Sequence, residues 1–184
     1  MNLRLNSRDV VVAALFGALY AIGVATLAPF AFSVFQVRIA DMLLPVTILF
    51  GWPAIVGITA GTFLGNFFGP YTIIDAVGGS FANLLGCTLA FFAARKLKQS
   101  SPYKGFIVGG WIINLVVTFI VGTYLFVYFP QFVPAFFGLP LITVAWLGIF
   151  IGSVIAINIG GTLLATAIYN RGLYSPEIRR LLKL

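Results

Sequence analysis

The chain has 184 residues, of which 61% are hydrophobic and only 8% are charged, and its mean hydropathy is +1.09. Soluble domains average about 25% charged residues, so the composition argues strongly against a water-soluble globule. The apolar runs are continuous and do not alternate with polar residues, which disfavours a β-barrel, and the length accommodates about six helices of roughly 20 residues. We therefore predict an all-α integral membrane protein with a single domain over residues 1–184.

The net charge of +7 comes from basic residues that flank the apolar runs. Ten of the eleven lie in three clusters: the N-terminal segment, Arg95–Lys104 and the tail that begins at Arg171. This arrangement follows the positive-inside rule and forms no basic patch among aromatic residues, so nucleic-acid binding is disfavoured.

The residue types that many enzymes require are scarce. The chain has no histidine and one cysteine, Cys87, which excludes a disulfide within the chain, a multi-cysteine metal site and most histidine-based catalysis. Neither a P-loop nor the Gly-x-Gly-Asp context of intramembrane aspartyl proteases is present, so Asp41 and Asp75 are not expected to form a catalytic pair. We predict no enzymatic activity, cofactor or metal site.

A first membrane-spanning helix is predicted from about Asp9 to Phe32. The preceding MNLRLNSRD resembles the start of a signal peptide, but the apolar run is too long for one and lacks a convincing cleavage site, so we expect a retained helix. Ser7 is positioned to cap this helix, and Asp9 lies in its first turn, where the helix dipole favours an acid.

Small residues recur along this first helix at a spacing that lets another helix approach closely in lipid. One line contains Ala14 and Ala18, and Ala13, Gly17 and Ala21 lie beside it. The lines serve either ordinary packing within the chain or the docking of a separate membrane subunit.

The second and third helices are predicted over about Val37–Phe50 and, after a turn at Trp52 and Pro53, up to about Phe68. Both are short for a full span, which indicates tilt or an extended entry. The third helix carries glycines at every fourth position, a pattern that predicts close helix contact: Gly57, Gly61 and Gly65.

Three longer helices complete the prediction, over about Thr72–Ala94, Gly105–Phe129 and Leu141–Tyr169. A hydrophilic loop, Arg95–Lys104, joins the first two, and an apolar connection, Pro130–Pro140, joins the last two. Six helices place both termini and the basic loop on one side of the membrane, which the charge rule makes cytoplasmic. The two halves show no convincing sequence repeat, which weakens an inverted-repeat transporter interpretation.

Charged residues within or at the edge of the predicted spans mark a functional site, because a charge at that depth is costly unless paired or solvated. Arg38, Asp41 and Asp75 are in this position, and further polar residues converge with them on the outer half of the bundle. The predicted substrate-binding residues are Gln36, Arg38, Asp41, Asn66, Tyr71, Asp75 and Trp146.

The chemistry of these residues leaves two interpretations open. Arg38 and Asp41 are three residues apart and able to form a structural salt bridge, whereas Asp75 requires Arg38 across the bundle, water or a ligand. Alternatively, the carboxylates and amides bind a polar, planar ligand on which aromatic rings stack. Deeper amides are expected to form hydrogen bonds between helices: Asn83, Asn114 and Asn158.

Three linked motifs resemble the queuosine-precursor transporter (QueT) family: QVRIADML from Gln36, TFLGNFF from Thr62 and TIIDAVGGS from Thr72. Their order and spacing match the family over most of 7–94, whereas the C-terminal half agrees mainly in hydropathy and helix count. Ala40-Asp41 replaces the usual Ser-Glu of the family, and Gly65 stands where alanine is common.

The resemblance implies the substrate-binding (S) component of an energy-coupling factor (ECF) ABC transporter in the cell membrane, which works with a coupling membrane subunit and two ATPase subunits. The implied ligand is a 7-deazaguanine such as preQ0, preQ1 or queuine. Asp75 or Asp41 would accept its paired N–H donors, Asn66 or Gln36 would lie near its carbonyl, and Arg38 would orient the acid or donate to that carbonyl. The resemblance also favours the line of Ala14 and Ala18 as the face on which the coupling subunit docks.

Other functions remain open at this point. The same topology would serve an S component for another vitamin, or a stand-alone facilitator or proton-coupled carrier with Asp75 as the proton site. A structural membrane subunit without a ligand is disfavoured by the clustered charges.

Overall fold

The computed structural model describes residues 6–26, 37–69, 71–97, 101–133, 135 and 138–173, which form helices and short connections without any strand. The elements are α1 (Ser7–Thr26), the 3-10 helix η1 (Ile39–Leu43), α3 (Thr47–Phe50), α4 (Trp52–Phe67), α5 (Thr72–Leu97), α6 (Pro102–Tyr128), the 3-10 turn η2 (Pro130–Phe132), α7 (Leu141–Ser153), the π-helix η3 (Val154–Gly161) and α8 (Thr162–Asn170). Because η1 joins α3 and the last three elements form one continuous helix, the described residues confirm the prediction of an all-α chain with six helical segments.

Four of the six segments are long and apolar enough to cross a membrane: α1, Ile73–Leu97, α6 and Leu141–Asn170. The other two are shorter. At 1.5 Å per residue, Ile39–Phe50 extends about 18 Å and α4 about 24 Å, against a hydrocarbon core of about 30 Å. The sequence-based expectation that these two helices fall short of a full span is confirmed.

The predicted helix boundaries agree with the structure to within a few residues, except at two places. The predicted end of the first helix at Phe32 lies outside the described residues. The turn expected at Trp52 and Pro53 is at Gly51, which has a φ of 68°, and Trp52 and Pro53 form the first turn of α4. Proline suits that position because the first turn of a helix leaves its N–H groups without an intrahelical partner.

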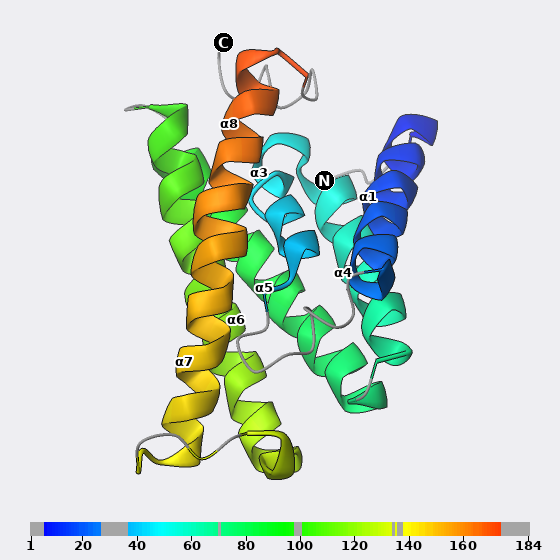
Figure 1. Cartoon of the computed structure of the whole chain (residues 1–184). Helices are drawn as coiled ribbons and strands as arrows, with labels where there is room; N and C mark the ends of the chain where they lie inside the picture. Colours follow the sequence, from blue (N-terminus) through cyan, green and yellow to red (C-terminus); the bar gives the residue numbers. More distant parts are fainter. Residues whose placement is uncertain are drawn as a thin grey trace.

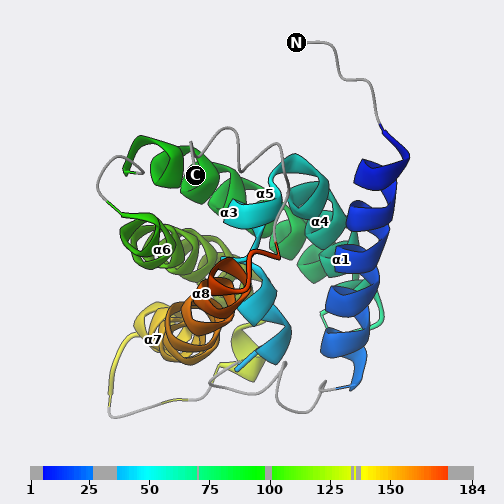
Figure 2. The same ribbon diagram turned by 90° about the horizontal axis from the view of Figure 1, so that it is seen from above.

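The bundle places the described ends of the chain on one side (Figure 1). The start of α1, the end of α5, the start of α6 and the end of α8 all lie at the upper end of the view, as the six-helix topology requires. Seen from above, α1 lies at the edge of the bundle against α4, and the short η1–α3 segment occupies the middle (Figure 2).

The helices α1 and α4 approach so closely that the backbone of one lies against the backbone of the other at two glycines of α4. A Cβ added at Gly57 would lie 2.2 Å from the carbonyl oxygen of Ala13, and one at Gly61 would lie 2.4 Å from the carbonyl oxygen of Gly17. The predicted close contact of the glycine ladder is therefore confirmed, and its partner is α1. This contact uses the line of Ala13 and Gly17, whereas Ala14 and Ala18 are exposed.

The short segment Ile39–Phe50 is enclosed by protein, which explains how so short a helix is accommodated at membrane depth. Most of its side chains are buried, and η1 packs against α1 and η3. Glycines of η3 allow this approach, since a Cβ on Gly161 would lie 2.7 Å from the ring of Pro45. Irregular backbone at membrane depth is tolerated where protein covers it.

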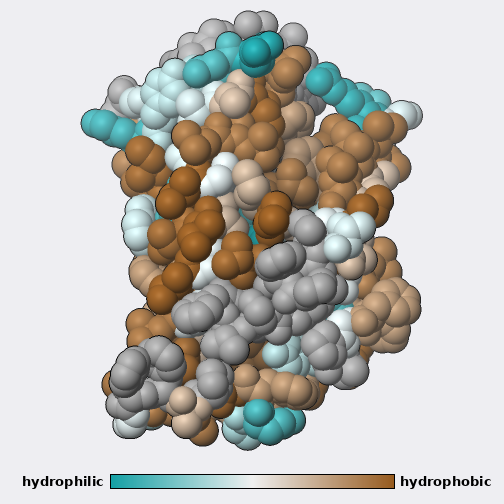
Figure 3. All heavy atoms as spheres, viewed as in Figure 1, coloured by the Kyte–Doolittle hydropathy of each residue, from teal (hydrophilic) through white to brown (hydrophobic). Residues whose placement is uncertain are grey.

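The outer surface is that of a membrane protein. Large apolar side chains are exposed on every long helix, among them Leu15, Phe81, Phe119 and Ile155. The space-filling view shows hydrophobic residues over the middle of the face that is drawn, and hydrophilic residues gathered at its upper end (Figure 3). An apolar middle with polar ends matches a chain that crosses a bilayer.

Candidate functional site

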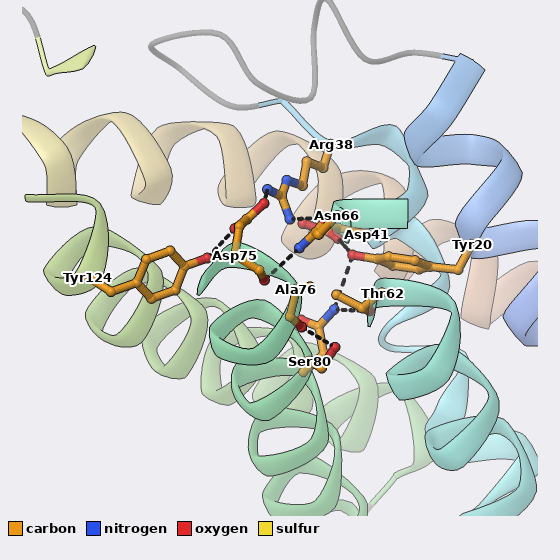
Figure 4. Close-up of polar contacts among 10 residues, drawn as sticks. Tyr20, Arg38, Asp41, Thr62, Asn66, Asp75, Ala76, Ser80 and Tyr124 are labelled. Carbon is orange, nitrogen blue, oxygen red and sulfur yellow. Dashed lines mark hydrogen bonds and ion pairs between the residues drawn. The ribbon is translucent and has the colours of Figure 1, made fainter. Parts of the chain in front are cut away.

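Five helical segments bring polar side chains together inside the bundle (Figure 4). Tyr20 comes from α1, Arg38 and Asp41 from the entry to and first turn of η1, Asn66 from the end of α4, Asp75 and Asn83 from α5, and Tyr124 from α6. All of these side chains are buried. We refer to this set as the polar cluster.

Arg38 and Asp75 form the ion pair of the polar cluster. The distance between Arg38 Nη2 and Asp75 Oδ2 is 3.2 Å, and the two residues are 6% and 0% exposed. Arg38 Nη1 donates to Asn66 Oδ1 at 3.3 Å, and Asn66 Nδ2 donates to the backbone carbonyl of Asp75 at 3.1 Å. The Tyr124 hydroxyl donates to the other carboxylate oxygen of Asp75. Of the three partners considered for Asp75, the structure provides Arg38 across the bundle.

The salt bridge between Arg38 and Asp41 that their spacing allows does not form. Arg38 precedes η1 with an extended backbone, φ −85° and ψ 99°, so the two residues do not share the face of an α-helix. Arg38 instead reaches Asp75, which lies in the first turn of α5, where the helix dipole also favours a carboxylate.

Asp41 has a different set of neighbours. The Tyr20 hydroxyl donates to Asp41 Oδ1 at 2.5 Å and in turn accepts a hydrogen bond from Asn83 Nδ2 at 3.0 Å. Asn83 Nδ2 also lies 2.9 Å from Thr62 Oγ1. These contacts connect α1, η1, α4 and α5, and they confirm the prediction that Asn83 bonds between helices.

The other two deep amides form a separate pair. Asn114 Nδ2 donates to Asn158 Oδ1 at 2.6 Å, and Thr118 Oγ1 donates to Asn114 Oδ1 at 3.0 Å. These contacts hold α6 against η3, as expected of interhelical hydrogen bonds.

Two glycines of the TIIDAVGGS motif make room for the polar cluster. A Cβ on Gly78 would lie 2.7 Å from the ring of Tyr124, and a Cβ on Gly79 would lie 2.6 Å from Asn66 Nδ2. Side chains at these positions would displace the groups that hold Asp75 and Arg38. The glycine pair therefore has a packing role in the site itself.

A small cavity of about 10 Å³ adjoins the polar cluster. Its lining combines polar and apolar residues: Arg38, Asp41, Gly79, Asn83, Val117, Val121, Ile149 and Ser153. This volume is on the scale of a single water molecule, so a ring-sized ligand requires the surrounding helices to move apart.

Two further predicted residues, Tyr71 and Trp146, are not part of the cavity lining. Tyr71 is buried, and its ring packs against the rings of Phe129 and Phe132, whose centroids lie 5.0 and 5.4 Å from its own. Trp146 is partly exposed on α7, where its Nε1 donates to Thr123 Oγ1 at 3.2 Å. Gln36 lies outside the described residues.

Sequence reasoning did not list Tyr20, Asn83 or Tyr124 among the site residues. Tyr20 is the only tyrosine of α1, and a buried tyrosine needs a partner for its hydroxyl, which was an available signal. Tyr124 falls at the expected end of its helix, but its contact with Asp75 depends on how α5 and α6 cross. No periodicity in the sequence encodes that crossing.

The fold and the site define a multi-pass helical membrane protein with a buried, charged centre between its helices. The model of the QueT transporter family matches residues 10–170, and the chain belongs to this family. It is accordingly a transport protein and not an enzyme. Comparison with curated proteins gave no match, and neither did comparison with solved structures. The family resemblance of the three sequence motifs is thereby confirmed.

Proposed function

We propose that the chain is the substrate-binding S component of an ECF transporter in the cell membrane and that it takes up a 7-deazaguanine such as preQ0, preQ1 or queuine from the outer face. The observation that carries this proposal is the polar cluster, in which two carboxylates and a guanidinium are buried beside a cavity. Charged groups at such depth are characteristic of substrate pathways.

The ring edge of a 7-deazaguanine matches these groups. An N–H and an exocyclic NH2 lie side by side and suit the two oxygens of one carboxylate, while the neighbouring carbonyl suits a guanidinium donor. Asp41 and Arg38 line the cavity, whereas Asp75 is fully buried behind Arg38. The sequence left either acid as the acceptor of the ligand's N–H donors. The position of Asp41 in the cavity lining favours Asp41 for this role and Asp75 as the residue that positions Arg38.

Thermal unfolding of the detergent-purified protein against deazapurines, purines and vitamins tests the ligand. A ligand that binds the folded state raises Tm as its concentration exceeds Kd, by a stabilisation of RT ln(1 + [L]/Kd). We expect a shift with preQ0, preQ1 or queuine, and we expect Asp41→Asn to make this shift smaller by raising the apparent Kd at least tenfold.

Asp9→Asn makes the same chemical change at the start of α1, outside the polar cluster, and is expected to leave the shift intact. A shift with an unrelated vitamin alone would retain the S component and discard the deazaguanine. No shift with any compound would contradict a stand-alone binding site and favour a gradient-driven carrier.

The energy for uptake has to come from elsewhere, because the chain contains no P-loop. We propose a coupling membrane subunit and two ATPase subunits as partners, with the exposed line of Ala14 and Ala18 on α1 as the docking face. Both termini are then cytoplasmic, in keeping with the exposed basic residues at the end of the bundle where α1 begins and α8 ends.

Enlarging both alanines tests the docking face. Ala14→Leu with Ala18→Leu is expected to reduce co-purification of the coupling and ATPase subunits at least tenfold and to leave the ligand-induced Tm shift unchanged, because these side chains point away from the bundle. Ala60→Leu makes one such substitution at an exposed position of α4 and serves as the control. Wild-type protein that binds ligand but co-purifies with no ATPase would contradict the partner proposal.

A further inference from the structure

The charges of the polar cluster do not balance. It contains one guanidinium, Arg38, and two carboxylates, Asp41 and Asp75, all at most 6% exposed. The other basic residues of the described part of the chain are exposed: Arg8, Arg95, Lys96, Lys104 and Arg171. With both carboxylates ionised, the buried centre carries a net charge of −1.

The surplus negative charge lies on the cavity side. Asp75 is paired with Arg38 at 3.2 Å and also accepts the Tyr124 hydroxyl. Asp41 lines the cavity, and within the described residues its side chain accepts one hydrogen bond, from the neutral Tyr20 hydroxyl. A hydroxyl orients a carboxylate but does not neutralise it, so the uncompensated charge remains at Asp41.

We propose that the site selects ligands with one positive charge, namely a planar, hydrogen-bonding ring that carries a protonated amine. This inference rests on the proposed function and narrows its ligand class. A buried net charge is costly, and a cationic ligand removes it on binding, whereas a neutral ligand leaves it in place. In a medium of low dielectric constant a charge acts across the whole polar cluster, so the ammonium group need not contact Asp41 itself.

Two compounds with the same ring test this selection. preQ1 carries an aminomethyl group that is protonated at neutral pH, and preQ0 carries a neutral nitrile at the same position. We expect the wild-type protein to bind preQ1 at least tenfold more tightly than preQ0. Asp41→Asn makes the polar cluster neutral and is expected to bring the ratio of the two Kd values close to one, even where it weakens both. Asp9→Asn is expected to keep the wild-type ratio.

Equal Kd values for the two compounds on the wild-type protein would overturn the selection for a cation and leave the proposed function standing. Failure of both to bind would overturn the proposed function and the selection with it. Calorimetric titration of preQ1 in two buffers of different ionisation enthalpy supplies a measurement that needs no variant. We expect no proton release, and release of about one proton per ligand would overturn the proposal because Asp41 would then be neutral in the free protein.

Discussion

Replacement of Arg38 by methionine is expected to abolish ligand binding and to lower the free energy of unfolding by about 3–5 kcal/mol. Methionine retains much of the apolar volume of the side chain but removes the guanidinium, which leaves Asp41 and Asp75 buried without a counter-charge. Removal of one partner of a buried ion pair costs far more than the pair itself contributes, because the remaining charge has lost its solvent and its partner.

A double variant separates the two effects of this substitution. Arg38→Met together with Asp75→Asn restores the net charge of −1 of the wild-type polar cluster, so we expect most of the lost stability to return. Binding is not expected to return, because the guanidinium that lines the cavity is still missing. Chemical unfolding in detergent measures the first effect and ligand-dependent Tm the second. A single variant as stable as the wild type would show that the ion pair does not hold the bundle.

Substitution of alanine for Gly57 is expected to destabilise the protein by about 1–3 kcal/mol and to weaken ligand binding at the same time. The added Cβ would lie 2.2 Å from the carbonyl oxygen of Ala13, a backbone atom that moves only if α1 moves. Displacement of α1 also withdraws Tyr20 from Asp41. The coupled loss of stability and affinity distinguishes this variant from a purely local defect.

Gly86 on α5 provides the matched control. A Cβ at Gly86 would lie 3.4 Å from Ile113 Cα, an ordinary contact, so alanine is tolerated there. Its effect is expected to range from neutral to a gain of about 1 kcal/mol, because alanine favours helix over glycine. Unfolding curves and Kd measurements on the two variants make the comparison. If Gly57→Ala and Gly86→Ala had the same effect on stability and affinity, the close backbone packing of α1 on α4 would not be the cause of the losses expected at Gly57.

The fold was largely predictable because a bilayer leaves few choices for the backbone. Continuous apolar runs have to become helices, and glycines and prolines mark where the helices end. The same restriction made the buried charges conspicuous, so Arg38, Asp41 and Asp75 stood out without any structural information. The spacing of Gly57 and Gly61 predicted a close helix contact as well, since few other functions require glycine at every fourth position.

The pairings within the site were not predictable in the same way. The sequence offered Arg38 two partners, Asp41 by helical spacing and Asp75 across the bundle, and spacing alone did not decide between them. The observed partner, Asp75, is 37 residues away and is reached because Arg38 stands outside any helix. The partners Tyr20 and Tyr124 likewise depend on helix crossings. Trp146 was among the predicted substrate-binding residues, and the structure gives it a contact with Thr123 on α6 instead of a place in the cavity lining.

The small size of the cavity has a consequence for the transport cycle. The side chains of the polar cluster form an ion pair and hydrogen bonds with one another, so a ligand binds only to the fraction of molecules in which these internal contacts have opened. The observed Kd then exceeds the intrinsic one by the reciprocal of the open fraction, about a hundredfold if one molecule in a hundred is open. The internal contacts that weaken binding form again when the ligand leaves, so they also favour its release.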